Sequence, residues 1–380
     1  MLSDFYGSMY KGLDTFNREA TGFLAAASLD ADVARAAKGQ SVMSPVATAG
    51  EIVDLEESNW ADYKPVDTGN VDSVEVKMEN FNVVRIELGG EATRGLNNGG
   101  NYDIIMEGKF RDAFRKLANK MERYVAGKAI AGSCRAYGTP GTTPFGTAGD
   151  MMDFAQMAKI LDDNGAPNEE RNLILNSTAF ANLRGKQTIL LKTNEAGSDE
   201  FLREGYTSPV IGFKLWSSAG LTQVAGCAAT GYTINGAHTA GAKALTVDGG
   251  SGAIAAGTII TIGGVKYVVA EDVEAGDTTI KINAPGLVAD VADDTAITIN
   301  AAAYTPCVAF QKNAIVLATR QPSDPEGGDG ADEQYTLVDP VTGIAFDIRL
   351  YRMYHKAWLE VGIASGAKVV KGDNSALLLG

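Results

Sequence analysis

The hydrophobic pattern is clearest in the last third of the chain, where it predicts a succession of β-strands. Two apolar runs lie within residues 305–319, and a loop rich in glycine, proline and acidic residues follows at 321–333. After a short run at 335–338, apolar residues occupy every second position: Ile344, Phe346, Ile348 and Leu350. Because a period of two gives a strand one apolar and one more polar face, we predict a half-buried strand over 344–351.

The longest helical pattern covers residues 102–130. Its apolar positions recur at steps of three and four and form one stripe, made of Phe110, Phe114, Leu117, Met121 and Val125. Charged residues, Glu122 among them, are assigned to the opposite side, and Asn101 or Asp103 is the predicted N-cap. A helix of this length would measure ~42 Å, which suits a spine across a flat subunit.

The first hundred residues are predicted to form extensions of the body. Residues 1–50 are rich in small side chains and are interpreted as an arm, with an amphipathic helix near 15–35. Residues 51–100 are acidic, and the alternation at 74–78 and 83–88 predicts a β-hairpin ended by Gly89 and Gly90. Since a lone hairpin is marginal in water, we expect this one to rest on another surface.

A second group of elements follows a Gly/Pro/Thr-rich linker at 138–149. A helix is predicted at 150–164, with Gly165 at its end. A short buried strand at 173–175, a helix at 178–183 capped by Ser177, a polar loop at 184–205 and a strand at 210–216 complete the group.

The amino-acid composition changes between Cys227 and Cys307, where glycine, alanine, threonine and β-branched residues dominate. Short strands are predicted at 245–247, 258–262, 265–269, 278–282 and 296–299, and Gly263-Gly264 is a predicted hairpin turn. The first and last pairs of strands are weakly similar, which suggests a duplication. We interpret residues 227–306 as a small inserted β-barrel or sandwich.

Composition narrows the classes of function. The chain has 380 residues, a net charge of −14 and 45% hydrophobic residues, which is globular composition and enough for two or three compact units. No basic stripe is present, so tight DNA binding is disfavoured, and an acidic surface would repel enclosed DNA. The apolar run at 22–27 is too short for a signal peptide or membrane span, and we expect folding in a cytoplasm.

Candidate catalytic residues are few. His238 and His355 are the only histidines, and both are better interpreted as surface or packing residues than as members of a nucleophilic triad. Residues 250–255 fit a loose dinucleotide-binding pattern, but the strand predicted after them favours a plain turn. We therefore predict no catalytic, cofactor-binding or metal-binding residue, and no cofactor.

Two further groups of residues leave alternatives open. The loop at 321–333 gathers acidic residues that suggest either a calcium site or, as the favoured interpretation, a solvated flexible loop: Asp324, Glu326, Asp329, Asp332 and Glu333. The three cysteines, including Cys134, lack metal-type spacing. Cys227 and Cys307 bracket the insert, so they are either a close pair able to oxidise or, as favoured in a reducing cytosol, two buried thiols.

The order of these elements resembles the Hong Kong 97-type major capsid protein of tailed phages. Residues 153–183 are similar to its axial-domain segment, and 208–221 to the strand that follows, with its Gly-Phe pair. Residues 308–322 resemble the strand and turn that re-enter the core, and 342–370 the closing strands of the peripheral domain. The resemblance covers nearly the whole chain apart from the insert, which resembles the β domain of one coat-protein group of short-tailed phages.

The resemblance implies an α+β fold of the Hong Kong 97 type. Its parts would be an N-terminal arm (1–50), an extended hairpin loop (51–100), a spine helix with the peripheral domain (101–145), an axial domain (146–226), the inserted all-β domain (227–306) and the returning core strands (307–380). The resemblance further implies a non-enzymatic coat protein that forms hexamers and pentamers of an icosahedral shell around double-stranded DNA.

The implied partners are the chain itself, a separate scaffolding protein, a portal protein and decoration proteins. The implied location is the virion capsid, assembled in the host cytoplasm, with no membrane and no sequence-specific DNA contact. Some members crosslink their subunits through lysines; Lys64, Lys77 and Lys192 are available here, without a supporting motif.

Two alternatives stay open. One is a shell protein of a cargo-enclosing nanocompartment, which would need a cargo-docking groove. The other is a β-rich carbohydrate-binding protein with the insert as its binding module. The shortage of paired acids near aromatic residues and the missing secretion signal disfavour the second alternative.

Overall fold

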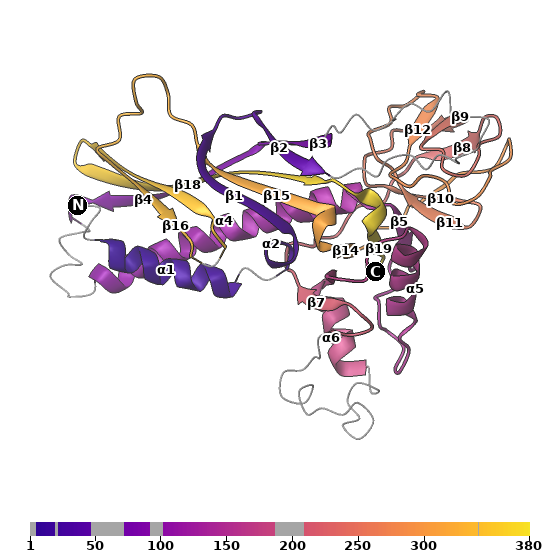
Figure 1. Ribbon diagram of the computed structural model, residues 1–380, viewed down its shortest axis with the longest axis horizontal. Helices are drawn as coiled ribbons and strands as arrows, with labels where there is room; N and C mark the ends of the chain where they lie inside the picture. Colours follow the sequence, from indigo (N-terminus) through magenta and orange to yellow (C-terminus); the bar gives the residue numbers. More distant parts are fainter. Residues whose placement is uncertain (1–4, 20–21, 47–71, 92–101, 187–208, 341) are drawn as a thin grey trace, which may run out of the picture.

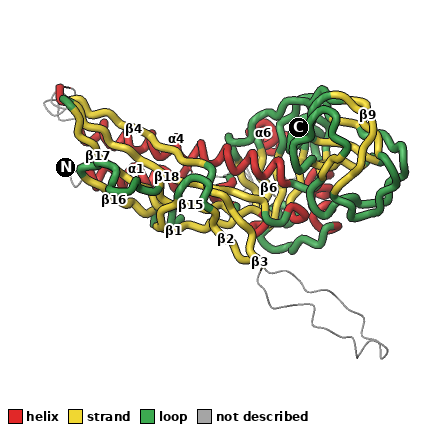
Figure 2. Tube along the Cα trace, turned by 90° about the horizontal axis from the view of Figure 1, so that it is seen from above, coloured by secondary structure: helices red, strands yellow, loops and turns green. Residues whose placement is uncertain are grey.

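A computed structural model describes residues 5–19, 22–46, 72–91, 102–186, 209–340 and 342–380. The chain forms a mixed α+β body that is clearly elongated (Figure 1). A sheet backed by two helices occupies one end, and the segment 227–306 occupies the other. Figure 2 shows the same long axis from above, with the helical layer running beside the sheet.

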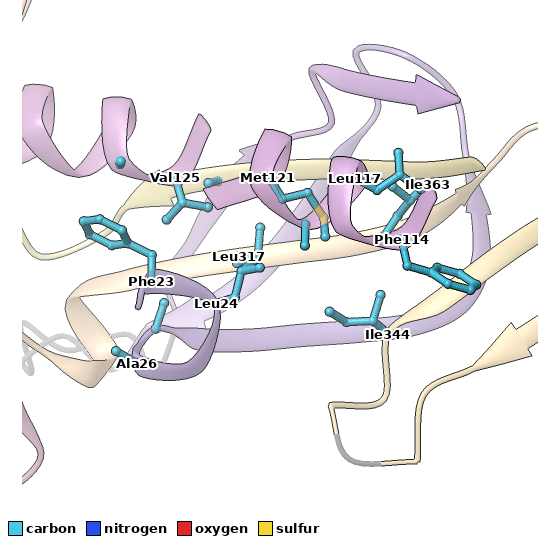
Figure 3. Close-up of a cluster of buried hydrophobic side chains, with 14 of the residues drawn as sticks. Phe23, Leu24, Ala26, Phe114, Leu117, Met121, Val125, Leu317, Ile344 and Ile363 are labelled. Carbon is cyan, nitrogen blue, oxygen red and sulfur yellow. The ribbon is translucent and has the colours of Figure 1, made fainter. Parts of the chain in front are cut away.

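The long helix α4 (Tyr102–Gly132) joins the two ends and confirms the helix predicted over residues 102–130. Its 31 residues span ~46 Å, and each residue of the predicted apolar stripe is at most 2% exposed. The stripe packs on the sheet and on two short helices, α1 (Tyr6–Glu19) and α2 (Phe23–Ala26) (Figure 3). Burying one large apolar side chain contributes ~2 kcal/mol, so this single face fixes the helix in place.

The sheet beneath α4 has six strands and three open edges. Its strands are β1 (Ser28–Ala36), β15 (Ile315–Pro322), β18 (Lys356–Val369), β17 (Ala345–Met353), β16 (Glu333–Val338) and β4 (Asn80–Gly89). The long strand β18 pairs with β4 along one edge and with β15 and β17 along the other. In the described part of the chain, β1, β4 and β16 each pair on one side only.

A second sheet of eight strands lies at the other end of α4. Its order is β13 (Thr298–Ile299), β10 (Ile259–Ile262), β11 (Val265–Val268), β5 (Arg135–Tyr137), β19 (Ser375–Leu378), β14 (Cys307–Gln311), β6 (Arg171–Leu175) and β7 (Lys214–Ser217). Helices α5 (Met152–Asp163) and α6 (Ser177–Lys186) share a hydrophobic cluster with this sheet. The predicted helix at 150–164 is confirmed, and Gly165 follows it with φ +73°.

The segment 227–306 has a hydrophobic cluster whose buried members all come from residues 229–299. A three-stranded sheet of β8 (Thr230–Ile234), β9 (Ala244–Ser251) and β12 (Thr279–Lys281) covers it. The predicted turn at Gly263-Gly264 is confirmed, because Ile262 pairs with Val265 and both glycines have positive φ. However, β11 pairs with β5, so this segment shares a sheet with the body instead of closing on itself. Strand β8 was not predicted.

The helix predicted near residues 15–35 is wrong. The helix α1 ends at Glu19, and residues 28–36 form β1, which pairs in parallel with β15. The register of the helix is set by Phe5, Met9 and Leu13, which recur every four residues and are at most 3% exposed. This stripe lies ahead of residue 15, so the helix was predicted too far along the chain.

The hairpin predicted from 74–78 and 83–88 is also wrong, although both strands exist. Strand β3 (Asp72–Lys77) pairs with β2 (Ser41–Val46), whereas β4 pairs with β18. Period-two alternation indicates a strand but does not identify the strand with which it pairs.

Met78, which is fully buried, and Glu79 carry the chain from one sheet to the other. Glu79 is tied to α4 by Tyr124 Oη and Lys128 Nζ, both 2.9 Å from its Oε2. Most of the predicted loop 51–100 lies outside the described residues.

Three smaller predictions need correction or fall outside the described residues. Asn176, and not Ser177, caps α6, because its Oδ1 accepts a 2.7 Å bond from Ala179 N–H. Strand β7 begins at Lys214, four residues later than predicted, after a tight turn that bridges Val210 and Phe213. The predicted cap Asn101 and most of the loop 184–205 lie outside the described residues.

Candidate functional site

Glu122 is buried at the junction of three segments of the chain. Its side chain points from α4 between the N-terminal segment and the loop after β7, and the residue is 6% exposed. Its Oε1 accepts hydrogen bonds from Phe23 N–H at 2.8 Å and from the Ser218 hydroxyl at 2.6 Å, and Oε2 accepts one from Leu24 N–H at 3.1 Å. A single carboxylate therefore joins the spine helix to both neighbouring segments.

Two glycines make room for this carboxylate. A Cβ on Gly22, where φ is +108°, would lie 2.3 Å from Glu122 Oε1. A Cβ on Gly220 would lie 2.9 Å from Glu122 Cγ. Such distances are shorter than those of Cβ atoms in real proteins, so a side chain at either position would have to displace the Glu122 side chain.

The pKa of Glu122 is raised by burial, while the hydrogen bonds from Ser218, Phe23 and Leu24 lower it in part. The predicted place of Glu122 on the exposed side of the helix was wrong. Ala118 and Ala126, four residues to either side, are buried on the same face. An acidic residue with a small residue four positions to either side was therefore the signal in the sequence that Glu122 is buried.

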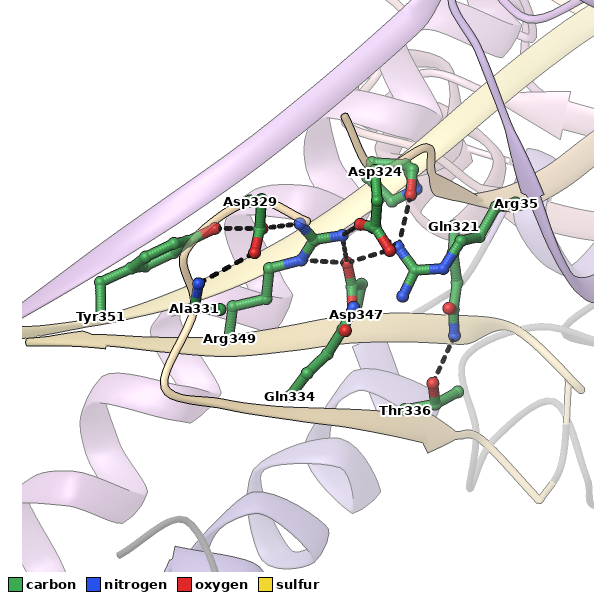
Figure 4. Close-up of polar contacts among 11 residues, drawn as sticks. Arg35, Gln321, Asp324, Asp329, Ala331, Gln334, Thr336, Asp347, Arg349 and Tyr351 are labelled. Carbon is green, nitrogen blue, oxygen red and sulfur yellow. Dashed lines mark hydrogen bonds and ion pairs between the residues drawn. The ribbon is translucent and has the colours of Figure 1, made fainter. Parts of the chain in front are cut away.

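A second buried charge cluster lies on β17, on the face that was predicted to be the wetter one (Figure 4). Arg349, 8% exposed, contacts three carboxylates. Its Nη2 lies 2.5 Å from Asp324 Oδ1 and 2.5 Å from Asp347 Oδ2, and its Nη1 donates to Asp329. Tyr351 Oη donates to the same Asp329 carboxylate at 2.6 Å.

The cluster extends to the N-terminal strand β1. Arg35 Nη1 lies 2.5 Å from Asp324 Oδ1 and 3.8 Å from Asp347 Oδ2. Burial raises the pKa of Asp347, whereas the hydrogen bond from Gln334 and the charge of Arg35 lower it. The network thus holds β1, the glycine-rich loop and β17 together at one end of the sheet.

The prediction of a solvated, flexible loop is wrong for part of residues 321–333. Asp324 and Asp329 are held in place by ion pairs with Arg349, because a buried guanidinium is stabilised by carboxylates around it. Asp332 lies 3.3 Å from Arg352 Nε, and Arg352 Nη2 lies 3.9 Å from Glu333. Glu326 is exposed. Among the described residues, no group of three metal-ligand side chains is placed to hold a metal ion.

The structure separates the two histidines. His238 is half-buried in the segment 227–306, and its Nε2 accepts a 3.1 Å bond from Thr246 N–H. His355 is exposed in the turn between β17 and β18, with φ +54°, and its ring stacks edge-on against Tyr354. Each contact is of the surface or packing kind that was predicted.

The three cysteines are free thiols. Cys307 is buried in the cluster of the eight-stranded sheet, and burial raises its pKa to about 12. Cys227 instead packs at the margin of the 229–299 cluster, and its thiol donates to Ala253 C=O at 3.4 Å. The two thiols therefore have different surroundings, and no disulfide joins them.

Residues 250–255, which fit the loose dinucleotide-binding pattern, form the end of β9 and a turn, with no helix directly after them.

The turn between β17 and β18 presents two exposed apolar residues at the sheet-bearing end. Tyr354 is 90% exposed and Met353 is 56% exposed. Both lie at the tip of the antiparallel pair formed by β17 and β18.

Of the three lysines considered for crosslinks, Lys77 lies at the end of β3, and Lys64 and Lys192 lie outside the described residues.

No helix within the described ranges is long and apolar enough to cross a membrane. No protein-family model and no curated protein matches the chain.

Solved structures similar to this chain include the capsid of the cyanophage P-SCSP1u, with 13% identity, a TM-score of 0.48 and coverage of 94% of this chain and 87% of that one. A structure from Mycobacterium phage Che8 has 12% identity, a TM-score of 0.45 and coverage of 91% and 88%. A virus-like particle from Pyrococcus furiosus has 12% identity, a TM-score of 0.43 and coverage of 98% and 99%. All three TM-scores lie below 0.5.

Proposed function

We propose that this chain is the major capsid protein of a tailed phage. It would assemble into hexamers and pentamers of an icosahedral shell that encloses packaged double-stranded DNA. The observation that carries the proposal is the elongated body, in which one helix of 31 residues joins a sheet at one end to a second sheet at the other. A subunit that tiles a surface needs reach of this kind, whereas an enzyme of this size usually closes around a pocket.

The edges of the body support assembly with like copies. Strands β1, β4 and β16 leave one side unpaired in the described residues, and an unpaired edge is a template for another chain. Met353 and Tyr354 at the β17–β18 tip expose apolar surface that a neighbouring subunit would cover. Many small contacts of this kind add up to a stable closed assembly.

The net charge of the chain is consistent with a shell that encloses DNA without binding it tightly. A net charge of −14 favours repulsion between the shell and packaged phosphates. No sequence-specific DNA contact and no catalytic role are part of the proposal. A cargo-enclosing nanocompartment would share the same assembly but contain protein instead of nucleic acid.

We assign the parts of a Hong Kong 97-type subunit as follows. The N-terminal arm is 1–50, the extended loop 51–100, the spine helix and peripheral domain 101–145, the axial domain 146–226, the inserted all-β domain 227–306 and the returning strands 307–380. The separate hydrophobic cluster of residues 229–299 supports the inserted domain. Further proposed partners are a scaffolding protein, a portal protein and decoration proteins, with assembly in the host cytoplasm.

Sedimentation velocity tests the proposal. The purified chain, expressed alone and with a candidate scaffolding protein, should sediment as capsomers or as shells of many copies. Nucleic acid or protein recovered from the particles distinguishes the phage capsid from the nanocompartment. A monomer under both conditions, together with specific glycan binding by the full chain on an array, would favour the carbohydrate-binding alternative instead.

A further inference from the structure

A pocket of about 400 Å³ lies where the segment 227–306 meets the body. Its walls come from α5, β5 and the turn between β10 and β11. Three cationic side chains line it, those of Arg135, Lys159 and Lys266, together with a single carboxylate, that of Asp163. In a chain with a net charge of −14, the pocket is a local concentration of positive charge.

Arg135 is the buried part of this pocket. The residue is 6% exposed, and its Nη2 donates to Asn164 Oδ1 at 2.8 Å and to Ile160 C=O at 3.1 Å, with Asp163 Oδ2 3.7 Å away. Its Nε is buried and finds no hydrogen-bond partner among the described residues. Because Asp163 Oδ2 lies 3.7 Å from this guanidinium, the positive charge of Arg135 is only partly neutralised within the pocket.

The two lysines are placed to complete the site. Lys159 is exposed on α5, and the described residues offer its ammonium group neither a hydrogen bond nor an ion pair. Lys266 Nζ donates to Gly138 C=O, and burial lowers the pKa of this lysine. A bound anion would favour the charged form of Lys266 and offset that effect.

We propose that this pocket binds a carboxylate from a neighbouring copy of the chain, supplied by the acidic turn at residues 271–277. This inference rests on the proposed shell function. The turn exposes Glu271, Asp272, Glu274 and Asp277.

Three of these four acids are already occupied within their own copy. Glu271 pairs with Lys281, and Asp272 and Asp277 accept bonds from Ala256 N–H and Glu274 N–H. The carboxylate of Glu274 has no partner among the described residues. Glu274 is therefore the group we assign to the pocket of the next copy.

The two surfaces lie at opposite ends of the segment 227–306. Figure 1 places β12, which follows the acidic turn, in the upper part of the segment, and α5 below β11 on its lower side. Glu274 thus does not reach the pocket of its own chain, and the contact must join two different patches on two copies. A repeated contact of this heterologous kind generates a ring when its rotation closes, as a capsomer requires.

Charge reversal in single and double variants tests the inference. Lys159→Glu and Glu274→Lys should each raise the protein concentration needed for assembly by about tenfold or more, a change equivalent to ~1.4 kcal/mol per contact. The double variant carries both changes in every copy, so each contact regains opposite charges and assembly should recover. Lys214→Glu, an exposed lysine on β7 outside the pocket, is the matched control.

The outcomes distinguish a failure of the pocket assignment from a failure of the shell function. Assembly of Lys159→Glu at the wild-type concentration, or failure of the double variant to recover, would overturn the pocket assignment and leave the shell function standing. Absence of assembly by the wild-type chain would remove the shell function and the pocket assignment with it. A salt dependence of assembly that is weaker in Lys159→Glu than in wild type would further support the ion pair.

Discussion

The backbone N–H of Phe23 donates a 2.8 Å hydrogen bond to Glu122 Oε1, across 99 positions of sequence. This bond places the start of α2 against the long helix α4. Because the carboxylate also accepts from Ser218, it fixes the loop after β7 as well. The junction of both ends of the body therefore depends on one buried acid.

Replacing Glu122 with alanine should destabilise the chain by ~3 kcal/mol. The variant leaves three buried donors without an acceptor, and each costs about 1 kcal/mol or more. Arg123→Ala, at the exposed position next to it, should change stability by less than about 0.5 kcal/mol. Urea unfolding measures both variants, and equal midpoints for the two would contradict the role of Glu122.

Gly22→Ala should be more damaging than Gly39→Ala. Both glycines have positive φ, +108° and +84°, so both variants carry the backbone strain of a left-handed conformation. Only at Gly22 does the added Cβ approach the Glu122 carboxylate; nothing lies within 4 Å at Gly39. We expect an additional cost of about 1–2 kcal/mol at Gly22, measured by thermal unfolding. Equal losses would mean that the Glu122 side chain can move aside.

Stability should depend on pH through Glu79. Its pKa is lowered from 4.5, first by the hydrogen bond with Lys128, and the proton is thus held less tightly in the folded state. Its stabilising contribution is present above the unfolded pKa and is lost as pH falls through the lowered folded value. Wild type should therefore be more stable than Glu79→Gln at pH 7, with the difference shrinking as the pH falls below the unfolded value of 4.5. A difference between wild type and Glu79→Gln that does not change with pH would contradict this role of Glu79.

Arg349→Gln should loosen the glycine-rich loop at 323–332. The change leaves Asp347, 2% exposed, without its closest cation, and breaking a buried ion pair costs about 3–5 kcal/mol. Limited proteolysis should then cut the loop faster than in wild type. Lys356→Gln, at an exposed position that pairs with Glu87 and not with the loop, should leave the rate of cleavage nearly unchanged. Identical cleavage rates in the two variants would show that Arg349 does not hold the loop.

The elements with a clear period were predictable from sequence. The stripe of Phe110 and Phe114 gave α4, and the alternation from Ile344 to Leu350 gave β17, because each pattern reports the face that is buried. The turn at Gly263-Gly264 was predictable because its conformation requires two residues with positive φ.

What the sequence did not reveal are the contacts between distant segments. Strands β3 and β4 look like a hairpin, yet each pairs elsewhere, because alternation carries no information on the partner. Glu122 and Arg349 look like surface charges, since nothing local shows that a donor or a carboxylate from another segment will meet them. The pocket around Arg135 likewise forms only when β11 joins β5.

Negative-stain electron microscopy of the soluble fraction, with the chain expressed alone and with a candidate scaffolding protein, tests the central claim most directly. The shell function predicts closed icosahedral particles or rings of five and six subunits. A monodisperse population of single subunits under both conditions would contradict it.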